Sequence, residues 1–139
     1  MTLLEKRIAF TRFAALLPAQ AHDLGFDLCY GEILRSDEQA EINAIGAVGR
    51  AHVSSLIIGH FPTLAARISN NGKANGVRHS VHQLGLAVDV LLFENGHYLT
   101  DSESYKPLGE WWETLHEMCR WGGRFNDGGH FSMEHEGVK

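Results

Sequence analysis

The sequence predicts an α+β fold, a small single domain in which helices flank a mostly antiparallel sheet. Three observations support this class. Helical spacing dominates the first third of the chain, short strand-like runs follow, and the two do not alternate regularly as β-α-β units do. The 139 residues, 44% hydrophobic and 21% charged, suit a globular protein that buries a core. We therefore expect one domain over residues 1–139.

The first predicted element is a helix over residues 3–24. Its apolar residues recur at three- and four-residue intervals: they are Leu3, Ile8, Phe10, Phe13, Leu16, Leu17 and Leu24. Pro18 should kink or split this helix because proline donates no backbone hydrogen bond, and Gly25 should end it. A strand over residues 26–34 is expected next, with a bulge at Gly31.

A second helix is predicted from Ser36, which begins an S-x-x-Q capping box, to about Val48. Residues 50–69 are ambiguous, although residues 60–68 could form a short helix with Pro62 in its first turn. The composition of residues 70–76, rich in asparagine and glycine, predicts a loop.

The second half of the chain predicts most of the sheet. Residues 86–93 are almost continuously apolar, which is typical of a buried central strand. A hairpin turn with an Asn-Gly pair over residues 94–97 should lead to a short partner strand. A third helix is expected from Ser102 or Ser104 through Cys119, and a last strand over residues 130–133.

Charge and composition limit the partners that we expect. The net charge of −5 gives no sign of a nucleic-acid-binding surface. No stretch approaches the roughly 20 apolar residues that span a bilayer, so no membrane insertion is expected. The N-terminal residues lack the apolar core of a secretory signal, so we expect a cytoplasmic protein. We also expect a monomer. Cys29 and Cys119 lie far apart in sequence and predict two buried, reduced thiols.

Two motifs carry the chemistry. Residues 80–89 follow the pattern S-x-H-x-x-G-x-A-x-D, and residues 127–131 read D-G-G-H-F. Together they supply two imidazoles, one carboxylate that can complete a metal site, and a second carboxylate three residues before the last imidazole. A catalytic zinc site needs three protein ligands, one open position for water and a base beside it.

His82, Asp89 and His130 are the candidate zinc ligands. Asp89 lies on the predicted central strand and Gly85 permits a tight turn that lets His82 face the same point. Asp127 is the candidate base for a water at the metal, because Gly128 and Gly129 can break the strand alternation that would separate it from His130. The alternative is a chance combination of core histidines and surface acids.

At these motifs the sequence resembles the zinc D-alanyl-D-alanine carboxypeptidases of the VanY and VanX type, whose phage branch contains L-alanyl-D-glutamate endolysins. The resemblance to the phage branch is close and covers most of the chain. Its segments are the helix before Gly25 and residues 30–36 with Gln39, 80–89, 92–99, 107–112 and 119–125. It implies the antiparallel-sheet fold shared with the hedgehog signalling domain.

The resemblance also implies residue roles. His82, Asp89 and His130 correspond to the zinc ligands, and Asp127 to the catalytic acid and base, where many carboxypeptidases have glutamate. Arg35 corresponds to the cation that stabilises the oxyanion or holds a substrate carboxylate, and Ser80 to a residue that hydrogen-bonds the substrate. From the residues themselves, Arg35 could instead pair with a nearby acid, and Ser80 could cap a turn.

The implied function is hydrolysis of amide bonds in peptidoglycan stem peptides by a phage endolysin of the L-alanyl-D-glutamate endopeptidase type. Such an enzyme would accumulate in the host bacterial cytoplasm and reach the wall after release by a separate pore-forming protein. A D-alanyl-D-alanine carboxypeptidase is the alternative enzyme. A non-catalytic, metal-containing module that binds the cell wall is the alternative from another class.

Overall fold

The computed structural model describes residues 1–70 and 79–139 of the chain. Within them, five strands form one antiparallel sheet in the order β1-β2-β5-β4, with β3 paired to β2, and the predicted α+β class is confirmed. The strands are β1 (Asp27–Tyr30), β2 (Ala87–Glu94), β3 (His97–Tyr98), β4 (Cys119–Trp121) and β5 (His130–Met133). The loop expected over residues 70–76 lies, apart from Asn70, outside the described residues.

Six α-helices and two 3₁₀ helices occupy the described parts of the chain. The α-helices are α1 (Leu3–Ala14), α2 (Leu17–Asp23), α3 (Asp37–Ala44), α4 (Gly46–Ile57), α5 (Pro62–Ser69) and α6 (Lys106–Leu115). The 3₁₀ helices are η1 (Ser102–Tyr105) and η2 (Gly122–Phe125). No helix in the described ranges is both long enough and apolar enough to cross a membrane.

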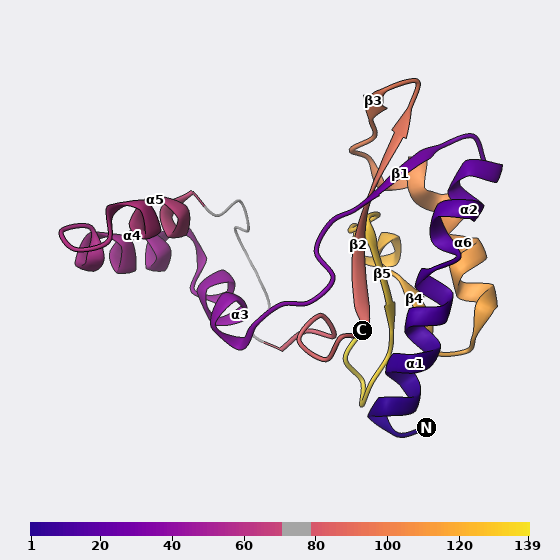
Figure 1. Ribbon diagram of the computed structural model, residues 1–139, viewed down its shortest axis with the longest axis horizontal. Helices are drawn as coiled ribbons and strands as arrows, with labels where there is room; N and C mark the ends of the chain where they lie inside the picture. The colour runs from indigo at the N-terminus through magenta and orange to yellow at the C-terminus, as the bar shows by residue number, and fades with distance from the viewer. Residues whose placement is uncertain (71–78) are drawn as a thin grey trace.

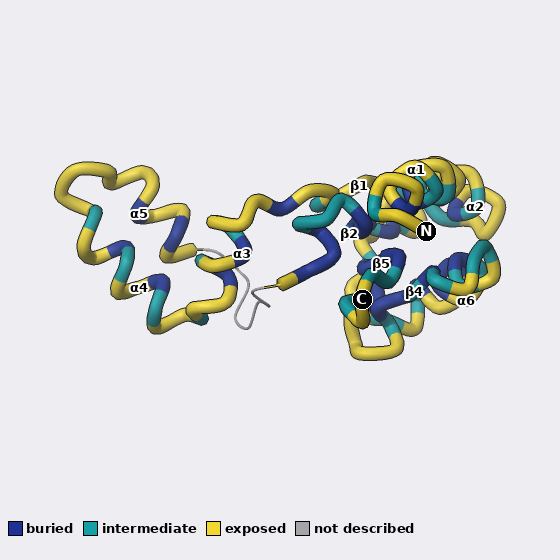
Figure 2. Tube along the Cα trace, turned by 90° about the horizontal axis from the view of Figure 1, so that it is seen from below, coloured by how far each residue is buried: buried dark blue, intermediate teal, exposed yellow. Residues whose placement is uncertain are grey.

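The molecule consists of a sheet covered on one face and an arm of helices that extends from it. Helices α1, α2 and α6 cover one face of the sheet, whereas α3, α4 and α5 project away on the opposite side (Figure 1). The buried residues concentrate between the sheet and its three helices, and the arm is largely exposed (Figure 2). Trp112 is at the centre of this core, edge-on to Phe10 and Phe131.

The predicted N-terminal helix is two helices. The helix divides after Ala14, and Pro18 occupies the first turn of α2, where its missing N–H costs little. Gly25 follows with a φ of +87°, as its role as a stop signal requires. Helix α1 begins with a complete capping box between Thr2 and Glu5.

The strand expected over residues 26–34 is shorter than predicted and ends at Tyr30. Beyond it, the Gly31 N–H donates to the Asp89 carbonyl and the Asp89 N–H donates to the Glu32 carbonyl, both at 2.7 Å. Gly31 and Glu32 thus lie opposite the single residue Asp89, which is the bulge expected at Gly31. The bulge turns the chain away from β2, so residues 33–36 form a loop over the sheet.

The helix expected to run from Ser36 to about Val48 is also interrupted. The Ser36 hydroxyl caps α3 by accepting the Gln39 N–H at 3.2 Å, but α3 ends at Ala44 and α4 begins at Gly46, whose φ is +70°. The ambiguous segment 50–69 is mostly helical, and Pro62 begins α5.

The third predicted helix was wrong at both ends. Asp101 is the N-cap, accepting the Ser104 N–H at 2.9 Å, and α6 ends at Leu115. Cys119 instead lies in β4, because pairing with β5 outweighs the local helical pattern. Cys119 is buried as expected, but Cys29 is exposed, because it lies opposite Leu91 on the face of the sheet that the helices leave uncovered.

The register between β2 and β5 determines which residues face the arm. Asp89 lies directly opposite His130 in this antiparallel pair, so their side chains share one face of the sheet. The neighbouring pair, Val88 and Phe131, points the other way into the core. The sheet therefore presents a carboxylate beside an imidazole on the face that its helices leave uncovered.

Candidate metal centre

His82 reaches this face from a turn that comes immediately before β2. The Leu86 N–H closes the turn on the Val81 carbonyl at 2.9 Å, and Gly85 adopts a φ of +64° within it. A residue with a side chain would be strained at that φ, so glycine is needed for this tight return of the chain. The turn leaves the His82 side chain buried beside β2 and β5.

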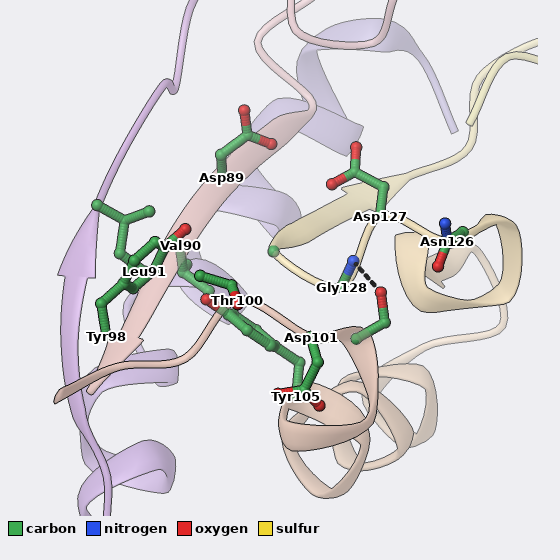
Figure 3. A pocket seen from close by; sticks show the side chains of 12 residues that line it. Asp89, Val90, Leu91, Tyr98, Thr100, Asp101, Tyr105, Asn126, Asp127 and Gly128 are labelled. Carbon is green, nitrogen blue, oxygen red and sulfur yellow. Dashed lines mark hydrogen bonds between the residues drawn. The ribbon is translucent and has the colours of Figure 1, made fainter. Parts of the chain in front are cut away.

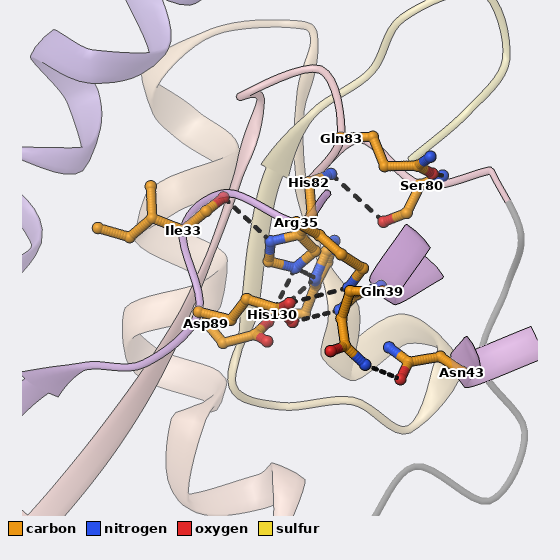
Figure 4. Close-up of polar contacts among 10 residues, drawn as sticks. Ile33, Arg35, Gln39, Asn43, Ser80, His82, Gln83, Asp89 and His130 are labelled. Carbon is orange, nitrogen blue, oxygen red and sulfur yellow. Dashed lines mark hydrogen bonds and ion pairs between the residues drawn. The ribbon is translucent and has the colours of Figure 1, made fainter. Parts of the chain in front are cut away.

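Three donor atoms from distant parts of the sequence form a nearly equilateral triangle (Figure 4). His82 Nε2 lies 3.2 Å from Asp89 Oδ1 and 3.2 Å from His130 Nδ1, and the third side, His130 Nδ1 to Asp89 Oδ1, is 3.3 Å. Two ligands bound at about 2.0–2.1 Å to a tetrahedral zinc lie roughly 3.3–3.4 Å apart. The triangle therefore has the size that zinc requires.

The surroundings of His82 suit a metal ligand. Its Nδ1 lies 3.3 Å from the Ile33 carbonyl oxygen, which can only accept a hydrogen bond, so this contact places a proton on Nδ1. In the neutral tautomer with that proton, Nε2 is the nitrogen free to bind a metal, and it faces Asp89 and His130. A metal-binding histidine commonly donates its second N–H to a backbone carbonyl in this way, so the donor set fits a metal ion.

Asp89 is held in its charged form. Burial disfavours the carboxylate, but hydrogen bonds with His130 and His82 outweigh burial, and the pKa of Asp89 lies well below its usual range. A ligand carboxylate must be ionised to bind a metal, so this environment favours metal binding. Among the described residues, His82, Asp89 and His130 form a cluster whose metal-binding atoms all lie within 4.8 Å of one another.

The loop after β1 holds the ligand residues by their backbones. Gly31 and Glu32 hydrogen-bond the carbonyl and the N–H of Asp89, respectively. The Arg35 N–H donates to the His82 carbonyl at 3.4 Å. Together with the Ile33 carbonyl, these contacts fix the orientation of two of the three ligands. His130 differs, since its Nε2 is buried and has no hydrogen-bond partner within the described residues.

Asp127 lies on a cavity that adjoins the triangle. The cavity has a volume of about 270 Å³, and Asp89 and Asp127 face each other across its mouth (Figure 3). The His130 N–H donates to the Asp127 carbonyl at 3.1 Å, which turns the chain tightly over Gly128 and Gly129. The two glycines thus form the tight turn between Asp127 and His130, and the role of Asp127 as base stays a prediction.

Arg35 is buried beside the site, and 6% of its surface is exposed. Its Nε donates to Glu32 Oε1 at 2.9 Å and its Nη2 donates to Glu32 Oε2. The hydrogen bond to Glu32 raises the pKa of Arg35, burial lowers it, and the charges of Asp89 and Asp127 raise it further. Arg35 therefore pairs with a nearby acid and also interacts electrostatically with both site carboxylates.

Ser80 has a local contact of the kind named as its alternative role. Its hydroxyl oxygen accepts the His82 N–H at 3.3 Å, while its own N–H donates to the Gln83 side chain at 2.8 Å. The hydroxyl thus stabilises the turn that carries His82. Contact between Ser80 and a substrate stays a prediction.

Sequence reasoning missed the residues that support the site. Glu32 precedes Arg35 by three positions in a loop, where spacing alone does not predict a contact. Tyr105 was also missed: its hydroxyl accepts the Leu92 N–H at 3.1 Å and donates to the Leu99 carbonyl at 2.9 Å, which shapes the cavity wall. The S-E-S-Y segment after Asp101 gave no signal of this bridging contact.

Comparison with known proteins agrees with the fold and the donor set. A family model described as D-alanyl-D-alanine carboxypeptidase matches residues 74–133, which include the triangle and Asp127. Among solved structures, the chain is similar to a mutant of the vancomycin-resistance D,D-pentapeptidase VanY, from a VanB-type resistance cassette, in complex with Zn(II). That similarity has a TM-score of 0.51 and 20% identity, covering 89% of this chain and 70% of that chain. No curated protein matches.

The fold, the family match and the donor triangle define the class of the protein. It is a zinc metallopeptidase, and zinc is its cofactor. When bound, zinc polarises a carbonyl group and lowers the pKa of a water ligand to about 7.

Proposed function

We propose that the chain hydrolyses amide bonds in the stem peptides of bacterial peptidoglycan. The observation that carries this proposal is the triangle of His82, Asp89 and His130 beside a cavity that also contains Asp127. The matched family and the zinc-bound neighbour are both described as peptidases of D-alanyl or D,D peptides, which are found in the bacterial wall.

In the proposed reaction, the residues of this chain move a proton and stabilise charge. The Asp127 carboxylate takes a proton from the attacking water and gives one to the nitrogen that leaves as the C–N bond breaks. Arg35 stabilises the negative charge that develops on the carbonyl oxygen, since a guanidinium beside the site needs little reorganisation to do so. His82, Asp89 and His130 hold the cofactor.

We further propose cleavage between L-alanine and D-glutamate, as in the phage endolysins that the sequence resembles. The support is the resemblance in residues 30–36, 80–89 and 119–125. The second candidate is a D-alanyl-D-alanine carboxypeptidase, which the description of the matched family favours. A non-catalytic wall-binding module is disfavoured by the Asp127 carboxylate, which lines the cavity beside the triangle, where a catalytic base would lie.

The experiment is a digest of purified peptidoglycan, with and without a chelator, analysed by mass spectrometry. New amino ends on D-glutamate support the endopeptidase, whereas released D-alanine supports the carboxypeptidase. Binding to the wall without any new ends would establish the non-catalytic alternative and refute hydrolysis. Products that form equally in the presence of chelator would refute the zinc mechanism.

The proposed location follows from the same resemblance. We propose that the protein accumulates in the cytoplasm of a host bacterium and acts after a separate pore-forming protein releases it. Expression in a bacterium with and without a membrane-permeabilising protein tests this. Lysis that occurs equally in both cultures would contradict the requirement for release.

A further inference from the structure

Glu32 shares the loop between β1 and α3 with Arg35, and its position suggests a function of its own. The Glu32 carboxylate contacts two donors of one guanidinium, Nε and Nη2, in the forked arrangement that fixes both the position and the plane of an arginine. The Arg35 side chain is almost completely buried, while 28% of the Glu32 side chain is exposed. The pair thus closes the site from the outside.

The same loop segment links this pair to the ligands. The Glu32 carbonyl accepts the Asp89 N–H at 2.7 Å, and the Arg35 N–H contacts the His82 carbonyl at 3.4 Å. The backbone of each residue is therefore attached to a different ligand residue. These backbone contacts still allow the Arg35 side chain to rotate, and its two hydrogen bonds to the Glu32 carboxylate prevent that rotation.

One edge of the guanidinium remains for the reaction. The hydrogen bonds to Glu32 use Nε and Nη2, and no contact of Arg35 with another described residue uses Nη1. The charges of Asp89 and Asp127 both act on Arg35, which places the guanidinium within electrostatic reach of the two site carboxylates. An arginine held on one edge can offer the other to an anionic oxygen at no further cost in side-chain entropy.

We propose that Glu32 is a positioning residue that orients Arg35 toward the oxygen of the scissile carbonyl. This inference rests on the proposed function, because it assigns Glu32 an effect on the same hydrolysis. Glu32 does not touch the substrate. It acts through Arg35, so its removal should lower kcat and leave KM and zinc binding nearly unchanged.

The test is a double-mutant cycle on hydrolysis of a stem peptide by the zinc-loaded enzyme. Glu32→Gln should lower kcat by about 10- to 100-fold, the scale expected when a catalytic group is misplaced by about an ångström. In an Arg35→Lys background, the same substitution should change kcat by less than about twofold, because lysine cannot form the forked pair. Glu110→Gln, which removes the same charge from an exposed position on α6, is the matched control and should be fully active.

Several results would overturn the inference. They are full activity of Glu32→Gln, an equal effect of that substitution in both backgrounds, loss of zinc or of folding in the variant, and an equal loss in the Glu110→Gln control. Each would show that Glu32 does not act through Arg35.

A readout independent of hydrolysis separates this inference from the proposed function. In the parent protein, the Arg35 Nε–H signal in an NMR spectrum should exchange slowly with water, and Arg35→Lys identifies it by its disappearance. Glu32→Gln should abolish that protection. Protection that persists in Glu32→Gln would refute the positioning contact, whether or not the parent cleaves a peptidoglycan peptide. Failure of the parent to cleave any such peptide would refute only the proposed function.

Discussion

Each histidine of the triangle uses a different ring nitrogen, and local contacts decide which one. His82 presents Nε2 because its Nδ1–H donates a hydrogen bond to the Ile33 carbonyl. His130 presents Nδ1, and its Nε2 is buried without a partner in the described part of the chain, near the ring of Phe125. A metal-binding histidine usually donates its second N–H to an acceptor, so His82 is the more firmly oriented of the two ligands.

At the same scale, Asp127 can be tested separately from the metal ligands. Asp127→Asn should retain zinc but lose hydrolysis by about 100-fold or more, because an amide cannot transfer the proton that general acid–base catalysis requires. Zinc content and the rate of peptide cleavage are the measurements. Asp101→Asn makes the same change on the same cavity wall and keeps the helix cap, so it should remain active. Equal activity of Asp127→Asn and the parent would disprove the assignment.

The two cysteines should differ in reactivity. Burial raises the pKa of the Cys119 thiol to about 12, so near pH 8 almost no reactive thiolate is present, whereas Cys29 is exposed. A thiol reagent should therefore label one cysteine per native chain and two after denaturation. Peptide mapping should find the native label on Cys29. Rapid labelling of Cys119 in the native protein would contradict the burial of β4.

At the scale of elements, α6 packs closely against β4 because Gly109 has no side chain. A Cβ at Gly109 would lie 2.1 Å from the Trp121 ring, and a Cβ at Gly123 would approach the same ring equally closely. Trp121 is buried and donates its Nε1–H to the Gly128 carbonyl at 2.8 Å. The indole thus fills the space between two glycines and supports the loop that carries Asp127.

This packing predicts the sign of a glycine substitution. Gly109→Ala should destabilise the protein by about 1–3 kcal/mol, the usual range for overpacking, although alanine is the better helix former by about 1 kcal/mol. The ring is large and buried, so it cannot move aside, and the clash outweighs the helix propensity. Denaturant unfolding measures the change. Gly59→Ala, with no atom within 4 Å of the added Cβ, is the control and should be nearly neutral.

At the scale of the whole molecule, the donor triangle brings together segments that are far apart in the sequence. The triangle connects the turn before β2, the strand β2 and the strand β5, and the loop after β1 is bonded to two of its residues. A zinc ion bound by all three donors would link these segments in the folded state alone. The bound ion should therefore stabilise the fold of the sheet as well as the reaction.

Removal of zinc should accordingly lower the melting temperature and abolish hydrolysis, and added zinc should restore both. Free zinc at 100 times its Kd would contribute about 2.7 kcal/mol by mass action. Differential scanning calorimetry with and without chelator measures the effect. A His130→Ala variant, lacking one ligand, should show a much smaller response to the chelator. If the chelator leaves the melting temperature of the parent unchanged, zinc does not stabilise the fold and the prediction is wrong.

The sequence by itself determined the fold class and proposed the residues of the site. The nearly continuous apolar run over residues 86–93 placed Asp89 on a buried strand, and the glycines at positions 85, 128 and 129 indicated the turns that bring His82, Asp127 and His130 to it. These features are local, since a backbone at positive φ or an alternating strand is governed by adjacent residues.

Only the tertiary structure decided which atoms meet. The end of α6 before Cys119, the choice of Asp89 as the residue opposite the Gly31 bulge and the pairing of Glu32 with Arg35 all depend on contacts between segments distant in the sequence or on a loop without periodicity. The register that sets Asp89 opposite His130 arises from burying Val88 and Phe131 together on the other face of the sheet. Hydrophobic burial between distant strands, which no local pattern encodes, therefore gives the donor triangle its 3.2–3.3 Å sides.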